Sequence, residues 1–170
     1  VDAIKFQTFV TERGISRYAP KADYQVKLTG KKESQFEMVK KLELSIEEHV
    51  ELIKCCEEYG ILFLSTPFDL PSVDALRELG LDTIKIPSGE IVNLPYLRKV
   101  GALGKQIILS TGMATIDEID KTLEILIESG TPLKDISILH CCTEYPAPME
   151  DINLLAMNTI KDRFKIEVGY

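Results

Sequence analysis

Strand patterns and helix patterns alternate along nearly the whole of this 170-residue chain. The strand patterns are short, apolar at consecutive positions and rich in isoleucine, which is typical of parallel strands buried on both faces. Strands are predicted at residues 2–9, 61–65, 83–86, 106–110, 135–141 and 165–168. This order predicts an α/β fold with a parallel sheet.

Capping signals support the predicted helices. Ser45 stands three residues before Glu48, and Thr115 stands three residues before Glu118, which is the spacing of a capping box. A glycine ends each of these two helical patterns, as is common at helix C-termini. Helices are predicted at residues 33–42, 45–60, 71–80, 94–103, 115–130 and 152–163.

Two architectures fit this order, a doubly wound sheet and a (β/α)8 TIM barrel. The chain has no GxGxxG turn, which argues against a dinucleotide-binding sheet. Regular spacing, and polar residues after nearly every strand, favour the barrel. A complete barrel takes roughly 250 residues, so we expect an incomplete one with about six parallel strands.

The ends of the chain lead to the same expectation. The sequence begins without Met inside one predicted strand and stops inside another, whereas domain boundaries usually fall in linkers. We therefore interpret residues 1–170 as part of the barrel of a longer polypeptide. Missing strands leave open sheet edges, which predicts marginal stability for this piece alone.

Residues 10–32 interrupt the rhythm of strands and helices. The segment is too long for an ordinary loop, and loops beyond about 12–15 residues tend to be functional lids or disordered. Residues 10–33 contain six basic and three acidic side chains, a net charge of +3 within a chain of −7. Since it follows the first predicted strand, we expect it to overhang the mouth of the barrel.

Composition excludes several classes of partner. The chain has 27 acidic and 20 basic residues, so a nucleic-acid partner is not expected. It has neither an apolar run of the roughly 18–20 residues that cross a membrane nor a signal peptide at its start. The cysteines form two adjacent pairs, Cys55–Cys56 and Cys141–Cys142, unlike a CxxC motif. We expect reduced, packed thiols in a cytoplasmic protein.

Two lysines occupy unusual places. Lys85 stands among the branched residues of "TIKIPSGE", and Lys5 lies between Ile4 and Phe6 in "AIKFQTF". A desolvated ammonium costs several kcal/mol unless an anion meets it. Small polar residues follow the same strands, and in a barrel the strand ends form one mouth where the active site lies. Lysines with hydroxyls and glycine N–H groups make a cradle for phosphate or carboxylate, so the sequence predicts an anion site.

Each of these residues also has a structural interpretation. A strand lysine is often an edge residue that extends its ammonium to water. The pairs Ser65–Thr66 and Ser110–Thr111 have the chemistry of helix caps, and Asp69 fits an N-cap better than a catalyst. Glu90 either pairs with Lys85 or is a carboxylate that transfers protons.

The two histidines give weaker signals. His49 lies among glutamates in a predicted helix and is expected on the solvated surface. His140 ends an apolar strand and fits a packed side chain better than a ligand. No convincing set of metal ligands is predicted within the chain.

Seven blocks of the sequence resemble the sialic acid synthase family, that is, N-acetylneuraminate synthases and their legionaminate relatives. The blocks occur in order over essentially the whole chain, and so many matches are highly specific. They are "VDAIKFQTF", "APKADYQ", "ESQFEMVKKLELS", "FLSTPFD", "IKIPSGEIVNLPYL", "ILSTGMAT" and "LHCCTEYPAPMEDINL".

The resemblance implies a (β/α)8 barrel followed by a small antifreeze-like domain that completes the partner's site in a homodimer. The implied reaction condenses phosphoenolpyruvate with an N-acetylated amino sugar of the N-acetylmannosamine type. C3 of phosphoenolpyruvate attacks the open-chain aldehyde, water attacks C2, and the C–O bond breaks. The products are a nine-carbon keto sugar acid and phosphate. A divalent metal, Mn2+ or Mg2+, polarises the aldehyde.

The resemblance also implies roles for single residues. Those that would hold the phosphate and carboxylate of phosphoenolpyruvate are Lys5, Thr66, Lys85, Ser88, Ser110 and Thr143. Gln7 and Tyr145 would contact the sugar, and Glu90, with Lys85, would be the catalytic acid/base candidate. At position 143 some members of the family have Asn or Ser, which also donate hydrogen bonds.

Some parts that the resemblance implies lie outside the chain. They are the first strand with its acidic residue, the serine-aspartate-histidine motif expected after Tyr170, the second metal histidine and the antifreeze-like domain. We therefore expect both metal ligands to lie outside residues 1–170.

Several alternatives stay open. The enzyme could be a legionaminate or pseudaminate synthase that uses another amino sugar, and "APKADYQ" leans toward the neuraminate and legionaminate side. A Schiff-base aldolase with Lys85 as its nucleophile is a more distant rival. The chain could also be a truncated, non-catalytic barrel that binds phosphate without turnover.

Overall fold

The computed structural model describes residues 1–30 and 32–170 and confirms the alternation of strands and helices. The strands are β1 (Ala3–Thr8), β2 (Leu62–Pro67), β3 (Thr83–Ile86), β4 (Gln106–Ser110), β5 (Ile136–Leu139) and β6 (Glu167–Gly169). The α-helices are α1 (Thr11–Gly14), α2 (Asp23–Thr29), α3 (Gln35–Lys40), α4 (Ile46–Glu58), α5 (Leu70–Glu78), α6 (Leu94–Gly101), α7 (Ile116–Ser129) and α8 (Ala156–Phe164). Short 3-10 turns are η1 (Ser88–Glu90), η2 (Leu133–Asp135) and η3 (Met149–Asp151).

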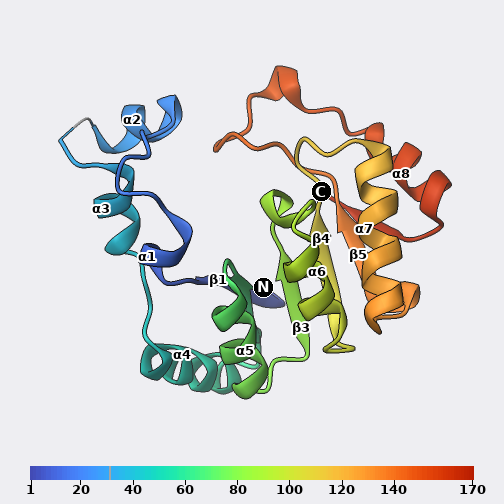
Figure 1. Cartoon of the computed structure of the whole chain (residues 1–170), viewed down its shortest axis with the longest axis horizontal. Coiled ribbons are helices and arrows are strands. Elements are labelled where there is room, and N and C mark those ends of the chain that lie inside the picture. Colours follow the sequence, from blue (N-terminus) through green and yellow to red (C-terminus); the bar gives the residue numbers. More distant parts are fainter. Residues whose placement is uncertain (31) are drawn as a thin grey trace.

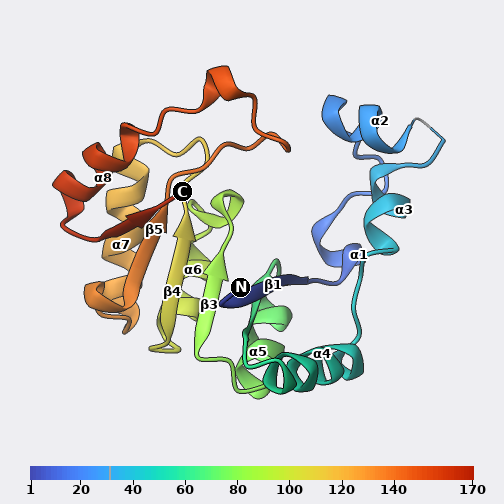
Figure 2. The ribbon, with the colours of Figure 1, turned by 180° about the vertical axis from the view of Figure 1, so that it is seen from behind.

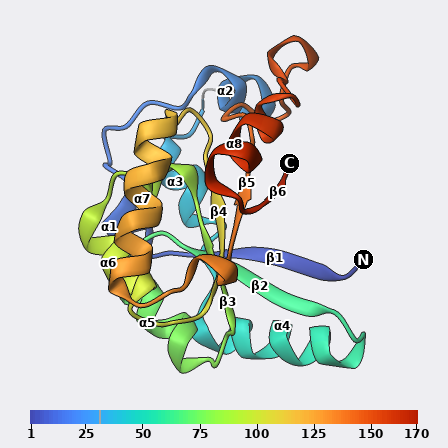
Figure 3. The same cartoon turned by 90° about the vertical axis from the view of Figure 1, so that its right-hand side faces the viewer.

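Every strand ladder in the described part of the chain is parallel. β1 pairs with β2, and β3, β4, β5 and β6 pair in chain order. β2 lies beside β3, although no ladder joins the two sheets in residues 1–30 and 32–170. Figure 3 shows β1 and β2 running across the direction of β4 and β5. Parallel strands that follow chain order are the arrangement of a TIM-barrel wall.

The helices cover one face of this wall. Figure 1 shows α5, α6 and α7 in front of the strands, and Figure 2, from behind, shows no helix across the opposite face of β3 and β4. In a barrel the helices form the outer ring, so the uncovered face corresponds to the interior. The predicted fold is confirmed as an α/β, TIM-barrel-type wall, which does not close within residues 1–30 and 32–170.

The core lies between β3–β5 and the helices that cover them. Ile84, Leu109 and Ile138 supply its sheet side, and Leu97 and Leu126 supply its helix side; all five are fully buried. Each such side chain contributes about 1.5–3 kcal/mol relative to exposure. This packing holds the strand ends in place.

The helix caps settle one alternative from the sequence. Asp69 caps α5, where its carboxylate accepts a 2.8 Å hydrogen bond from the Ser72 N–H group, as predicted. Thr115 caps α7. The interpretation of Ser65–Thr66 and Ser110–Thr111 as helix caps is therefore wrong. Ser65 and Thr66 lie within β2, Ser110 is the last residue of β4, and Thr111 follows it.

The described residues 10–30 and 32–44 form a lobe with the helices α1, α2 and α3, which Figure 1 shows well away from α7 and α8. Thr11 attaches the start of the lobe to its end, because its N–H group and hydroxyl both donate to the carboxylate of Glu43, at 3.0 and 2.8 Å. Tyr24 of α2 lines the large cavity at the strand ends. The expected overhang is confirmed. Lys31, part of the predicted basic segment, lies outside the described residues.

The prediction that His49 is a solvated surface residue is wrong. Its side chain is fully buried on the face of α4 that also carries Ile53 and Cys56. Its Nδ1 bonds to the carbonyl of Ser45 (2.7 Å) and its Nε2 to the hydroxyl of Thr8 (2.8 Å). Burial is tolerated because both ring nitrogens have partners, while the neighbouring glutamates lie on the outer face.

The packed setting predicted for His140 is confirmed. The side chain is partly buried, and its ring meets Tyr170 edge to face with centroids 5.9 Å apart. All four cysteines are free thiols, also as predicted, and Cys56 is buried. Cys55 is exposed, so the expected packing does not extend to it.

Candidate active site

Eight of the nine predicted site residues line one cavity of about 700 Å³. They come from β1, β2, β3, η1, β4 and the segment after β5, so the strand ends do converge. The eight are Lys5, Gln7, Thr66, Lys85, Ser88, Ser110, Thr143 and Tyr145. The ninth, Glu90, lines a different cavity.

Lys85 is the most buried charge in this cavity, with 7% of its surface exposed. Its ammonium donates to the hydroxyl of Ser110 at 2.5 Å and to the carbonyl of Ile86 at 2.9 Å. The register explains the first bond, because Lys85 pairs with Ile108 on β4 and Ser110 lies two residues further along the same strand. No carboxylate among the described residues lies within 4.0 Å of this ammonium.

Burial lowers the pKa of Lys85 from its ordinary 10.5 to about 8. The nearby Cys141 thiol opposes this shift, and the positive charge of Lys5 adds to it. A buried ammonium with only neutral partners is unfavourable. A bound anion would reverse that, and this is the electrostatic sign of an anion site.

Lys5 brings a second positive charge to the same cavity. Its side chain is solvent-exposed on β1, yet burial of part of its length lowers its pKa from 10.5. Gln7 lies two residues further on and pairs in register with Thr66 of β2. The open end of the two-stranded sheet therefore presents a cation, a carboxamide and a hydroxyl together.

Gly112, which the sequence predictions missed, allows three chain segments to meet at the cavity. A Cβ on Gly112 would lie 2.6 Å from Ser88 Oγ and 3.1 Å from Thr143 Cγ2. Its φ of +49° also favours glycine. The close approach lets Ser88 and Thr143, which both line the cavity, pack against the same glycine. The glycine in "STGM" was the available signal.

Six further lining residues were missed by the sequence predictions: Tyr24, Phe68, Pro87, Gly89, Leu139 and Cys141. Phe68 and Cys141 follow β2 and β5. The sequence predictions selected only polar residues after each strand, and including apolar residues would have added these two. Tyr24 lies in α2, and only its membership of the long basic segment pointed toward the mouth.

Glu90 lines a smaller adjoining cavity of about 230 Å³. Gln7 and Phe68 line both cavities and form the boundary between them. Glu90 accepts a 2.6 Å hydrogen bond from the Asn93 side chain. The interpretation of Glu90 as a structural ion-pair partner of Lys85 is therefore wrong.

The divalent metal that the family resemblance implies finds no site within the described residues. No three side chains of His, Cys, Asp or Glu in residues 1–30 and 32–170 lie together as a metal site requires. Glu90 and Cys141, a carboxylate and a thiol near the strand ends, line different cavities. The donor set of this part of the chain therefore does not fit a divalent metal.

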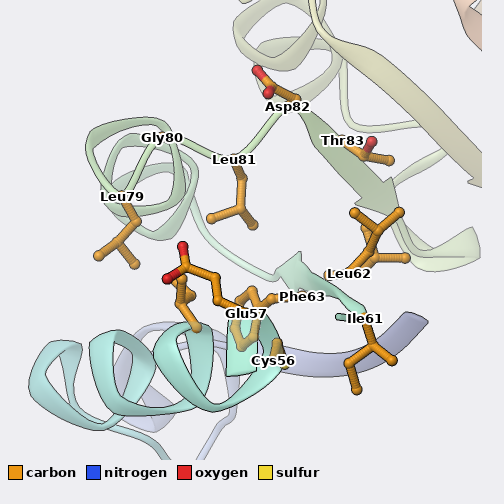
Figure 4. Close-up of a pocket in the computed structure, with 12 residues that line it drawn as sticks. Cys56, Glu57, Ile61, Leu62, Phe63, Leu79, Gly80, Leu81, Asp82 and Thr83 are labelled. Atoms are coloured by element: carbon orange, nitrogen blue, oxygen red, sulfur yellow. The ribbon is translucent and has the colours of Figure 1, made fainter. Parts of the chain in front are cut away.

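A pocket of about 290 Å³, lined by aliphatic side chains and by the carboxylates of Glu57 and Asp82, lies at the opposite ends of the strands, between α4 and α5. Figure 4 shows Leu79 and Leu81 pointing toward α4 and Phe63. It follows the seam where β2 and β3 lie side by side without a ladder. No lysine, arginine or histidine lines this pocket, so it does not share the chemistry of the strand-end cavity.

No helix in the described chain is long and apolar enough to span a bilayer.

Comparisons with known proteins identify the family of the chain. Residues 1–170 match the NeuB family. The chain is 55% identical over 169 residues to the N,N'-diacetyllegionaminic acid synthase of Campylobacter jejuni, covering 99% of this chain and 51% of the relative. It is 42% identical to the enzyme of the same name from Legionella pneumophila, with 99% and 48% covered.

A solved structure gives the same result. The N-acetylneuraminic acid synthetase of Leptospira borgpetersenii superposes with a TM-score of 0.82 at 30% identity, covering 99% of this chain and 53% of that one. The chain thus spans about half the length of these relatives. The match over all 170 residues and the shared architecture place the chain in the NeuB family.

Proposed function

We propose that the chain forms the phosphoenolpyruvate-binding part of a synthase that condenses phosphoenolpyruvate with an N-acylated amino sugar. The observation that carries this is Lys85, a buried ammonium with only neutral partners, in one cavity with Lys5 and a ring of hydroxyls. Phosphoenolpyruvate carries a phosphate and a carboxylate, so it supplies the charge that this cavity lacks.

The proposed reaction forms a bond between C3 of phosphoenolpyruvate and the aldehyde carbon of the open-chain sugar. The C2–C3 double bond supplies the electron pair, and the aldehyde oxygen takes a proton. Water then adds to C2, the bond from C2 to the phosphate oxygen breaks, and a keto acid and phosphate leave. Lys5 and Lys85 neutralise the bound anions and favour the departing phosphate.

The other site residues divide by position. Thr66, Ser88, Ser110 and Thr143 donate to the phosphate and carboxylate oxygens, because their hydroxyls line the cavity that holds both lysines. Gln7 and Tyr145 face the sugar. Glu90 is the proposed acid or base on the sugar side, since its cavity meets the larger one at Gln7.

The amino sugar is chosen by similarity. Two relatives with 55% and 42% identity are N,N'-diacetyllegionaminic acid synthases, whereas a pseudaminic acid synthase of Campylobacter jejuni shares 32%. These values favour a diacylamino sugar over N-acetylmannosamine, which the sequence motifs put first.

The rest of the site belongs to the remainder of a longer protein in this proposal. That remainder supplies the missing barrel strands, the ligands of a Mn2+ or Mg2+ ion, the antifreeze-like domain and the partner of a homodimer. A cytoplasmic location is part of the same proposal.

Phosphorus NMR of phosphoenolpyruvate tests the proposal on the full-length protein. We expect a saturable shift with the unsubstituted protein and none with Lys85→Ala. Lys105→Ala is the matched control, because Lys105 pairs with Asp82 on the surface at 2.6 Å and should leave the shift intact. Equal binding by Lys85→Ala would overturn the proposal. Binding without phosphate release in the presence of amino sugars and Mn2+ would favour the non-catalytic alternative.

The Schiff-base alternative has one observation in its favour, the lowered pKa of Lys85. An amine nucleophile must be unprotonated to react. Borohydride reduction in the presence of a keto acid or an aldehyde sugar separates the two mechanisms. A covalent adduct on Lys85 would support the aldolase, whereas the synthase forms none.

A further inference from the structure

A cavity of about 320 Å³ lies between α7 and α8. Its walls come from these two helices, from the turn before α8, and from residues that follow β4 and β5. The helices are joined by an ion pair in which Arg163 donates to the carboxylate of Asp120 at 2.9 Å. No residue lines both this cavity and the candidate active site, so the two are separate spaces.

The new cavity lies behind the wall of the candidate active site. Successive side chains along a strand point to opposite faces of a sheet. Leu139 and Cys141 line the candidate active site, whereas His140 between them lines the cavity of the helices. Ser110 and Thr111 divide between the two cavities in the same way. The ends of β4 and β5 therefore separate the two spaces.

His140 has a ring nitrogen that the described protein does not satisfy. Its Nε2 is fully buried, and no described residue forms a hydrogen bond with it. Buried polar atoms nearly always have a partner, so this atom calls for an explanation. In the other histidine of the chain, His49, both ring nitrogens are bonded. The His140 imidazole therefore keeps hydrogen-bonding capacity for a molecule in the cavity that it lines.

The rest of the lining disfavours a charged ligand. Apart from His140, no side chain that ionises lines this cavity. An ion of either sign would lose its hydration there without gaining an oppositely charged partner, which is costly. Ile116, Ile119 and Ile160 supply apolar walls, and the last two are buried. The lining therefore suits an uncharged molecule with an apolar body.

Water alone suits this lining less well than an organic molecule does. A buried water usually makes about three hydrogen bonds. Asn153 and Thr159 are exposed and lie at the rim, and the hydroxyl of Thr111 already donates to the Leu139 carbonyl at 3.2 Å. The imidazole is thus an isolated polar group among apolar walls. A volume of about 320 Å³ is within the range of cavities that hold small molecules.

We propose that the cavity between α7 and α8 is a binding site for a small uncharged molecule with an apolar body and one hydroxyl group. The body packs against Ile116, Ile119 and Ile160, and the hydroxyl pairs with the imidazole of His140. A hydroxyl both donates and accepts, so it fits either tautomer of the ring. The inference goes beyond the proposed function, because neither phosphoenolpyruvate nor a sugar enters it.

Ligand-observed proton NMR on the full-length protein tests the site with three probes that share a benzyl or phenyl ring: benzyl alcohol, benzoate and benzylammonium. We expect saturable binding of benzyl alcohol, and binding of each ion weaker by about tenfold or more, since an unpaired charge is costly to desolvate. Excess phosphoenolpyruvate should not displace benzyl alcohol, because the two cavities share no residue. The proposal is overturned if benzyl alcohol does not bind saturably, if all three probes bind equally, or if phosphoenolpyruvate displaces the alcohol.

Thr159→Phe tests where the probe lies. Thr159 is exposed at the rim, so a larger side chain there can occupy the cavity without disturbing the core, and benzyl alcohol affinity should be lost. Asn158→Phe is the matched control, because Asn158 is exposed on the same helix and lines neither cavity. It should leave the affinity unchanged. Undiminished binding by Thr159→Phe would place the probe elsewhere and overturn the proposal.

His140→Phe tests the hydrogen bond. The variant keeps a ring but removes both nitrogens, so the affinity for benzyl alcohol should fall about tenfold relative to that for toluene, which has no hydroxyl. An unchanged ratio of the two affinities would remove His140 from the site. Thermal unfolding shows whether each variant folds. If Thr159→Phe does not fold, Ala156→Leu narrows the same cavity from one turn earlier in α8 and decides in its place. If His140→Phe does not fold, the three-probe comparison and the rim variants decide.

Discussion

The ammonium of Lys85 donates a hydrogen bond to the hydroxyl of Ser110 across two neighbouring strands, over a distance of 2.5 Å. This contact joins two residues separated by 25 positions and faces the cavity that Lys5 also lines. The pair places a positive charge at the strand ends without a carboxylate to neutralise it. The free cavity therefore carries a positive charge that favours the binding of an anion.

Phosphoenolpyruvate affinity should depend on pH through Lys85. Burial lowers its pKa to about 8 in the folded protein, so the free site loses its charge as pH rises through 8, and affinity should fall about tenfold per pH unit above that value. Lys85→Arg stays charged and should show a flat profile between about pH 7 and 9.5. Titration calorimetry across this range checks the prediction, and a flat profile in the unsubstituted protein would contradict it.

The same pKa shift has a consequence for stability with a fixed sign. The folded state binds fewer protons than the unfolded state between about pH 8 and 10.5, so Lys85 makes the free energy of unfolding rise with pH in that window. Below pH 8 both states are protonated and the full penalty of burial is present. Urea denaturation of the unsubstituted protein and Lys85→Met should diverge in this window. Parallel pH profiles would show that Lys85 is not the titrating group.

Gly112→Ala should weaken phosphoenolpyruvate binding roughly tenfold, about 1.4 kcal/mol. The new Cβ would lie 2.6 Å from Ser88 Oγ and would displace this hydroxyl, whose residue lines the cavity. Gly60→Ala is the matched control, because Gly60 also has a positive φ, +64°, but has nothing within 4 Å of the added Cβ. It should cost about 1 kcal/mol of stability and leave affinity unchanged. Calorimetry measures both affinities. If both variants lost the same phosphoenolpyruvate affinity, the effect of Gly112→Ala would come from backbone strain and not from the contact with Ser88.

His49→Ala should lower the free energy of unfolding by about 2–4 kcal/mol. The change leaves a cavity and removes the partner of the Thr8 hydroxyl, which also bonds to Ser65 at 2.7 Å. Glu47→Ala, on the exposed side of the same helix, should stay within about 0.5 kcal/mol of the unsubstituted protein. Urea denaturation measures both. A loss below about 1 kcal/mol for His49→Ala would mean that the buried ring contributes little.

Glu90→Gln should separate catalysis from binding. Glu90 lies outside the cavity with the two lysines, so the KM for phosphoenolpyruvate should stay unchanged. General acid–base catalysis contributes typically about 10²–10⁴-fold, and kcat should fall by about that factor. Gln keeps an oxygen that can accept the Asn93 hydrogen bond. Steady-state kinetics decide, and an unchanged kcat would remove Glu90 from the chemistry.

The elements themselves could be predicted from the sequence, because their signals are local. The capping boxes at Ser45 and Thr115 act over three residues, and both occur in the structure as predicted. The residues that follow the strands could be selected for a related reason, since a parallel barrel brings all strand ends to one side. Eight of the nine residues that the family resemblance implies share a cavity at these strand ends.

The contacts that these residues make depend on tertiary packing. His49 is buried because α4 turns that one face toward Thr8, which is 41 residues away. Glu90 and Lys85 line different cavities, because Gln7 and Phe68, which come from two other strand ends, lie between them. Periodicity and capping report interactions within a few residues, whereas the partner of a buried polar group comes from distant strands and helices. Local signals in the chain therefore specify the strands, the helices and the end of the barrel where chemistry collects. Packing between distant segments specifies which charges are paired, which are buried, and which lie ready for a ligand.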